Sequence, residues 1–86
     1  MNAGEETVLD ARGQRCPLPV IRLARLVHDR PDVGVVVVLA TDPAAAHDVP
    51  AWCRMRGHRF LEARAEGDHS AYVVEVATPS TAAAGR

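Results

Sequence analysis

Hydrophobic and polar residues alternate along the chain in blocks that predict four strands and two helices. A short apolar and β-branched run over residues 6–10 ends at a turn sequence, which predicts an opening strand. From Val20 to His28 the apolar residues recur at intervals of three and four, the spacing of one helix face. The nearly continuous valines of residues 33–41 predict a central strand, and we expect something to cover each of its two apolar faces.

The segment after this strand predicts a second helix with an irregular start. Asp42 is a candidate cap, and Gly57 suits the end of the helix. Pro50 lacks the N–H group that a helix interior needs. We therefore expect an irregular first turn, followed by a helix that Asp48 caps and that runs from about Val49 to Arg56.

Two final strands, at about residues 58–65 and 71–77, are predicted to form a hairpin across residues 66–68. The resulting order β-α-β-α-β-β predicts an α/β fold, a two-layer sandwich in which two helices cover one face of a four-stranded mixed sheet. Residues 1–77 are expected to form a single domain. The small residues of 78–86 predict a disordered tail.

The composition limits the chain to one small domain with a modest core. It has 86 residues, of which 48% are hydrophobic, and a formal net charge of −1. Because this balance provides no overall basic surface, we do not expect direct binding to nucleic acid. All ten basic residues are arginine, which leaves cysteine, histidine and carboxylates for reactive chemistry. The histidines lack the spacing of metal ligands, and we expect neither a metal nor a cofactor.

The start of the sequence lacks the basic and apolar segments of a secretory signal. The longest apolar run, Val35 to Ala40, is too short to span a bilayer. We therefore expect a cytoplasmic protein without a membrane partner. In that reducing compartment, the two cysteines are not expected to form a structural disulfide.

The segment RGQRCPLPV places Cys16 at the predicted start of the first helix. Pro17 suits the first helical position, and the positive end of the helix, together with Arg12 and Arg15, is expected to favour the thiolate. A thiolate at an accessible helix start predicts a reactive nucleophile. The alternative is that Cys16 is a small buried hydrophobic residue, as free cysteines often are.

The residues that follow the cysteine have predicted supporting roles. Pro17 and Pro19 are expected to fix the approach of the chain to the helix and to keep the thiol outward. Leu18 lies on the polar side of the predicted helix with Arg22 and Arg25, where it is either part of a docking surface or an ordinary exposed leucine.

Two other residues are assigned structural roles. Cys53 lies beside Trp52 in the second predicted helix, where core packing is the expected use of a cysteine. Asp10, at the end of the first strand, is expected to cap the following turn through its side chain.

Three segments form a recognisable set: LDARGQRCPLPV, ATDPAAAHDVPAWCRMRGH and YVVEV. Together they resemble the TusA/SirA family of small sulfur-carrier proteins over about residues 8–77. The family's signature is a Cys-Pro-x-Pro motif at the start of the first helix, and its two-layer fold agrees with the order predicted above. The chain differs from the family at Gln14, where leucine is common, and at Arg22 and Arg25, which stand in place of lysines. On this resemblance the carrier cysteine is Cys16, its prolines are Pro17 and Pro19, and the second motif comprises Asp42, Pro43, Asp48, Pro50, Gly57 and His58.

The resemblance implies a sulfurtransferase-type carrier. Cys16 would take sulfane sulfur from a donor protein as a persulfide and pass it to an acceptor protein. The implied donor is of the cysteine desulfurase or rhodanese type. Members of the family are associated with tRNA thiolation, with cofactor synthesis and with oxidative sulfur metabolism, and the sequence leaves the pathway open.

Two other functions also remain open. A thiol redox protein or sensor would use Cys53 as the resolving partner of Cys16. An RNA-associated binding module is compatible with a small α/β fold, although three aromatic residues and a balanced charge disfavour independent RNA binding.

Overall fold

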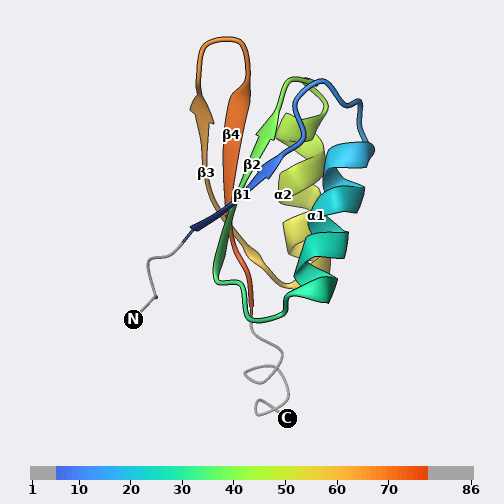
Figure 1. Cartoon of the computed structure of the whole chain (residues 1–86), viewed down its shortest axis with the longest axis vertical. Helices are drawn as coiled ribbons and strands as arrows, with labels where there is room; N and C mark the ends of the chain where they lie inside the picture. The colour runs from blue at the N-terminus through green and yellow to red at the C-terminus, as the bar shows by residue number, and fades with distance from the viewer. Residues whose placement is uncertain (1–5, 78–86) are drawn as a thin grey trace.

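The computed structural model describes residues 6–77, which form four strands and two helices (Figure 1). The predicted order β-α-β-α-β-β is confirmed. The predicted disordered tail, residues 78–86, lies outside the described residues. The elements are β1 (Glu6–Asp10), α1 (Leu18–Asp29), β2 (Val35–Ala40), α2 (Ala45–Arg56), β3 (Arg59–Ala65) and β4 (Ser70–Glu75).

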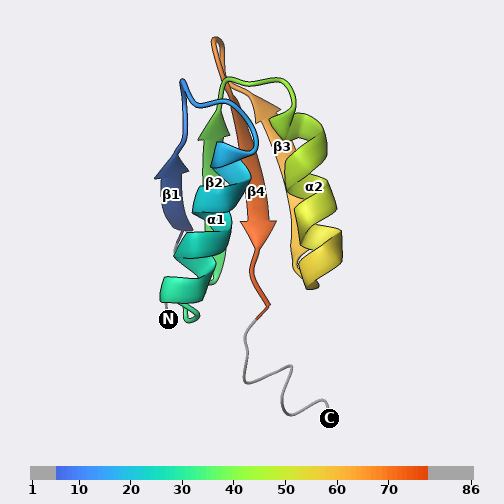
Figure 2. The ribbon, with the colours of Figure 1, turned by 90° about the vertical axis from the view of Figure 1, so that its right-hand side faces the viewer.

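The strands form one mixed sheet in the order β1-β2-β4-β3. β1 pairs with β2 in parallel, and the other two neighbouring pairs are antiparallel. Both helices lie on the same face of the sheet, as the sequence predicts (Figure 2). Within residues 6–77, neither helix is long and apolar enough to cross a membrane.

The core fills the space between the sheet and the two helices. Val36, Val38 and Val74 point from the central strands into this space and are fully buried. α1 contributes Leu23, and α2 contributes Val49. Burial of these β-branched side chains on a pleated surface explains why the valine-rich segments form the two central strands.

The second helix differs from its prediction, because α2 is continuous across Pro50. No side chain caps the first turn of α2, whose N-cap is Ala44. Asp42, not Asp48, acts just before the helix: its Oδ1 accepts a hydrogen bond of 2.9 Å from the Ala44 N–H. The predicted irregular turn corresponds to a tightly wound first turn of the helix. There, the N–H groups of residues 45–47 donate to carbonyls three residues earlier. Pro50 follows close behind this turn, and its one missing N–H does not divide the helix. Asp48 thus lies inside the helix, with its carboxylate available for another contact.

The sheet face opposite the helices is also apolar at its centre. Val37, Ala71 and Val73 form a small second cluster there, with Val35 and Leu39 packed beside them. The expectation that something covers each face of the second strand is confirmed on the helix side; on the other side neither helix of residues 6–77 lies over the sheet, yet Val37 is only 6% exposed.

Candidate functional site

Cys16 lies in the loop between β1 and α1, beside the segment that joins β2 to α2. Both segments follow parallel strands, so they meet at the same end of the sheet. Gly13, whose φ of 82° suits glycine, donates a 2.9 Å hydrogen bond to Thr41 Oγ1. The Cys16 N–H donates a 3.0 Å hydrogen bond to Asp42 Oδ2. These contacts attach the cysteine loop to the start of α2.

Asp42 connects the two helix starts through its two carboxylate oxygens. Its Oδ1 accepts from the Ala44 N–H and its Oδ2 accepts from the Cys16 N–H. These two hydrogen bonds, with a further contribution from the positive charge of Arg15, lower the pKa of Asp42. The carboxylate is therefore ionised at neutral pH, and its negative charge lies next to the cysteine.

The Cys16 thiol is held in its protonated form, which contradicts the sequence prediction of a favoured thiolate. Partial burial, the Asp48 carboxylate through its hydrogen-bonding capacity and its negative charge, and the negative charge of Asp42 raise the pKa of Cys16 to about 11. The side chain is still partly exposed and packs against the edge of the core. The alternative of a sealed core cysteine is therefore wrong for Cys16.

The arginines that were expected to activate the thiol make other contacts. Arg12 forms an exposed ion pair with Asp10, with nitrogen–oxygen distances of 2.9 and 2.7 Å. The Arg12 N–H also donates to Asp10 Oδ1 at 3.1 Å, which confirms the predicted capping of this turn. These bonds and the charge of Arg12 lower the pKa of Asp10. Arg15 is exposed and acts electrostatically on Asp42.

The motif residues after the cysteine divide between the surface and the core. Pro17 is exposed, its peptide bond to Cys16 is cis, and it immediately precedes the first residue of α1. Leu18 is 46% exposed, as predicted, whereas Pro19 is fully buried beneath the first turn. Ile21, one turn beyond Leu18, is 54% exposed. Ile21 was not among the predicted site residues, although its spacing of three from Leu18 places both on one side of the helix.

Arg22 was predicted to flank Leu18, but it instead bonds to the loop between β1 and α1. Its Nη1 donates to the Asp10 carbonyl at 2.8 Å and to Gln14 Oε1 at 2.9 Å. Gln14, at a position where the family often has leucine, thus acquires a specific partner. Arg25 remains exposed beside Ile21.

A groove of about 500 Å³ separates the outer faces of the two helices. Trp52 and Val27 contribute to its apolar lining, and Arg25, Arg56 and His58 contribute basic groups. The sequence assigned Trp52 only to packing and His58 only to a family motif. Their convergence depends on the pairing of α1 with α2, which no local pattern specifies.

Cys53 is fully buried in the core, as predicted, next to buried Trp52. Burial raises the pKa of the Cys53 thiol. A buried, protonated thiol is poorly suited to exchange with Cys16 or with a partner protein.

The family model described as Sulfurtransferase TusA matches residues 7–76. The chain belongs to the TusA family. Sulfur carrier protein TusA of Pseudomonas syringae pv. tomato is 43% identical over 61 residues, which are 71% of this chain and 73% of that protein. The protein of the same name from Pseudomonas aeruginosa is 38% identical over 66 residues, covering 77% of this chain and 84% of that protein. The crystal structure of the SirA-like protein from Desulfitobacterium hafniense has a TM-score of 0.65 at 25% identity, and covers 80% of this chain and 95% of that chain.

The two sequence motifs that suggested the TusA family meet in space. Cys16 comes from the first motif, and Asp42 and Asp48 come from the second. His58, at the end of the second motif, lies away from the thiol and stacks on Trp52 with ring centroids 4.7 Å apart. Its Nδ1 accepts a 3.0 Å hydrogen bond from the Ala77 N–H, so this TusA-family histidine fastens the chain beyond β4.

We expect His58 to make the fold less stable in acid. Burial, with a smaller effect of the Arg56 charge, lowers the pKa of His58 below its usual 6.5. Its stabilising effect is therefore present above about pH 6.5 and is lost as the pH falls toward the lower folded-state pKa. His58→Phe removes the titrating group and keeps a ring against Trp52. The variant should lose less unfolding free energy than the unmodified protein between about pH 7.5 and about pH 5, measured by urea denaturation.

The control is His47→Phe, because His47 is an exposed residue of the same helix region. This variant should retain the pH dependence of the unmodified protein. Equal pH dependence in the His58 variant and the unmodified protein would contradict the role assigned to His58.

Proposed function

We propose that the chain is a sulfur carrier that holds sulfane sulfur as a persulfide on Cys16. The observation that carries the proposal is the position of this thiol: partly exposed at the start of α1, with its backbone fixed by Asp42. A relay cysteine must be reached by two different proteins in turn, which a loop at a helix start permits and a closed cavity does not. The names of the TusA relatives support the same role.

Loading would be a sulfur exchange without net oxidation. The Cys16 sulfur attacks the outer sulfur of a donor persulfide, and a new sulfur–sulfur bond forms on Cys16 as the donor's bond breaks. The donor leaves as a thiolate, and the proton lost by Cys16 balances that charge. Asp48, whose carboxylate acts on the thiol, would receive this proton during the exchange. Transfer to the acceptor repeats the step, with the acceptor thiolate attacking the outer sulfur on Cys16.

The raised pKa of Cys16 supports transfer within a docked complex more than reaction in free solution. At neutral pH nearly all of the thiol is protonated, so it reacts slowly with small oxidants and electrophiles. A partner that brings positive charge close to Asp42 and Asp48 would lower the Cys16 pKa as it binds. Activation and docking would then occur together.

The donor and the acceptor are proposed to dock around the exposed side of α1. Leu18 and Ile21 provide an apolar contact next to the thiol, and Arg25 provides a positive charge at its margin. Pro19, buried below them, would hold this surface in place. A cysteine desulfurase or rhodanese fits the donor role. The reducing cytoplasm, where free thiols persist, would suit such a relay.

The thiol redox alternative has less support. It requires Cys53 as the resolving cysteine, and Cys53 is buried with a raised pKa. Both cysteines are free thiols within the described residues 6–77.

Intact-mass spectrometry after incubation with a sulfane sulfur donor tests the proposal. The expected product is one sulfur atom heavier, with the addition mapped to Cys16 by peptide analysis and removed by a thiol reductant. Adding an acceptor protein should then transfer the extra mass. Failure to load with a polysulfide, a rhodanese and a cysteine desulfurase in turn would overturn the proposal.

A further inference from the structure

The loop that carries Cys16, residues 11–16, lies outside the helices and strands and depends on specific hydrogen bonds for its shape. On one side, the N–H groups of Gly13 and Cys16 donate to side chains of the segment that joins β2 to α2. On the other side, the side chain of Arg22 reaches the loop from α1. The loop is therefore attached to both helices.

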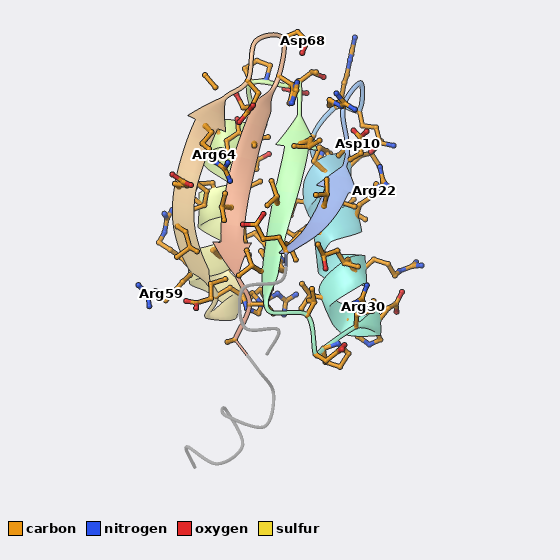
Figure 3. All side chains as sticks on the ribbon, turned by 60° about the vertical axis from the view of Figure 1, so that its left-hand side comes forward. Asp10, Arg22, Arg30, Arg59, Arg64 and Asp68 are labelled. Carbon is orange, nitrogen blue, oxygen red and sulfur yellow. The ribbon has the colours of Figure 1, made fainter. Side chains whose placement is uncertain are left out.

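Arg22 bonds to two parts of the chain that precede the cysteine. Its Nη1 donates to the carbonyl of Asp10, at the end of β1, at 2.8 Å, and to Gln14 Oε1 at 2.9 Å. Figure 3 shows Arg22 next to Asp10, with Arg30 at the opposite end of α1. One guanidinium thus ties the loop both to its own helix and to the end of the first strand.

The Arg22 side chain is held between α1 and β1. It is half-buried in a groove of about 470 Å³, to which Leu9 and Leu26 contribute apolar lining. A planar guanidinium that packs in this way loses little further freedom when it bonds. Arg22 can therefore hold the loop in one place relative to the helix.

Without Arg22, Gln14 would be weakly held. Its N–H donates to the Ala11 carbonyl at 3.3 Å, which is longer than the usual range for such a bond. Gln14 precedes Cys16 by two residues. A movement of its backbone therefore changes the dihedral angles that set where the thiol lies.

We infer that Arg22, acting through Gln14, is a positioning residue for sulfur exchange between Cys16 and a docked protein. The inference rests on the proposed carrier function. A docked donor presents its persulfide in one position, and a displacement of about 1 Å between reacting groups can slow a reaction about 100-fold. Inorganic polysulfide approaches freely and does not need the thiol in one place. Loss of the Arg22 bonds should therefore slow exchange with proteins and spare exchange with polysulfide.

The chemical step is the same with both donors. The Cys16 sulfur forms a bond to the outer sulfur of the donor, and the donor keeps the electron pair of the bond that breaks. The proton of Cys16 balances the charge. A difference between the two donors thus reports on position and not on the reactivity of the thiol.

Hydrogen exchange of the Cys16 amide tests the position of the loop without any sulfur donor. Arg22→Met keeps an apolar stem and removes both hydrogen bonds, and should speed this exchange about tenfold. Gln14→Met removes the acceptor oxygen without a change in charge, and should speed it about threefold. Gln14→Glu supplies another acceptor oxygen and should stay within about twofold of the unmodified protein. The Val38 amide of β2 is the reference, because a general loss of stability would speed its exchange as well.

Loading kinetics test the consequence for transfer. The protein donor is the rhodanese or cysteine desulfurase that loads the unmodified protein fastest. With this donor, Arg22→Met should lower kcat about tenfold and Gln14→Met about threefold, whereas the loading rate with polysulfide should stay within about twofold. KM should not change, because the residues proposed to dock are intact. The double variant Arg22→Met/Gln14→Met should be no slower than Arg22→Met alone, since loss of Arg22 already breaks the bond to Gln14.

Arg30→Met is the matched control, because it removes the same charge from the exposed far end of α1 (Figure 3). This variant should match the unmodified protein in every measurement. The inference is overturned if Arg22→Met leaves exchange of the Cys16 amide unchanged, if loading from polysulfide falls as much as loading from the protein donor, or if the two effects multiply in the double variant. If the unmodified protein takes sulfur from no donor, the carrier function is wrong, and exchange of the Cys16 amide still decides whether Arg22 positions the loop.

Discussion

Replacement of Cys16 by serine is expected to abolish sulfur loading. A hydroxyl is a poor nucleophile without a strong base beside it, and a serine oxygen cannot form a persulfide. The fold should tolerate the change, because the main anchor of this residue is its backbone N–H bond to Asp42. Intact mass after incubation with a sulfane sulfur donor should show no labile sulfur on the variant, and thermal unfolding should show a folded protein.

The matched control is Cys53→Ala, which removes the other free thiol of residues 6–77. Loss of a buried side chain should cost this variant about 1 kcal/mol of stability, while sulfur loading should continue. Labile sulfur on the Cys16→Ser variant would show that Cys16 is not the carrier. Loss of loading in a folded Cys53→Ala variant would favour the redox alternative.

The fold could be predicted because its determinants are local. The valines of β2 and β4, the apolar spacing of α1, and the turns between elements each specify one segment, and the α/β order follows from them. Pro50 led to the wrong start for α2, which begins at Ala45 and not at about Val49. Asp42 was predicted to cap the helix, and its carboxylate instead bonds the Ala44 N–H in the turn just before α2. The continuation of the helix through a proline depends on the whole opening turn and on burial of Val49.

The electrostatics of the site could not be predicted in the same way. Arg12 and Arg15 are close to Cys16 in sequence, and proximity along the chain suggested that they act on the thiol. Asp42 follows Cys16 by 26 residues, yet the parallel pairing of β1 with β2 brings it to hydrogen-bonding distance. Asp48 reaches the thiol for the same reason, because α2 begins directly after Asp42. The pKa of a site residue depends on the charges that the fold brings near it. Charges that are close only in sequence can therefore predict a pKa shift in the wrong direction.

Replacement of Asp48 by asparagine is therefore expected to make the Cys16 thiol more reactive. The change removes the Asp48 carboxylate, whose hydrogen-bonding capacity and negative charge are two of the causes that hold the pKa near 11. Burial and the charge of Asp42 remain, so the pKa should fall without returning fully to its ordinary value of 9.0. Each unit of decrease gives tenfold more thiolate near neutral pH, and the weaker nucleophilicity of that thiolate reduces the gain to about three- or fourfold.

The measurement is the rate of Cys16 alkylation by iodoacetamide as a function of pH, in a Cys53→Ala background that excludes the second thiol. The logarithm of the rate should rise with pH up to about pH 10 in the parent protein, and should level off at a lower pH after Asp48→Asn. Asp32→Asn, an equal change in charge at an exposed loop residue, is the control and should leave the profile unchanged. A profile for Asp48→Asn that matches the parent would show that Asp48 does not hold the thiol proton. Asp48 has two proposed effects: it suppresses the free thiolate, and it accepts the proton in the docked complex. Faster alkylation of Asp48→Asn together with slower sulfur loading from a protein donor would separate them.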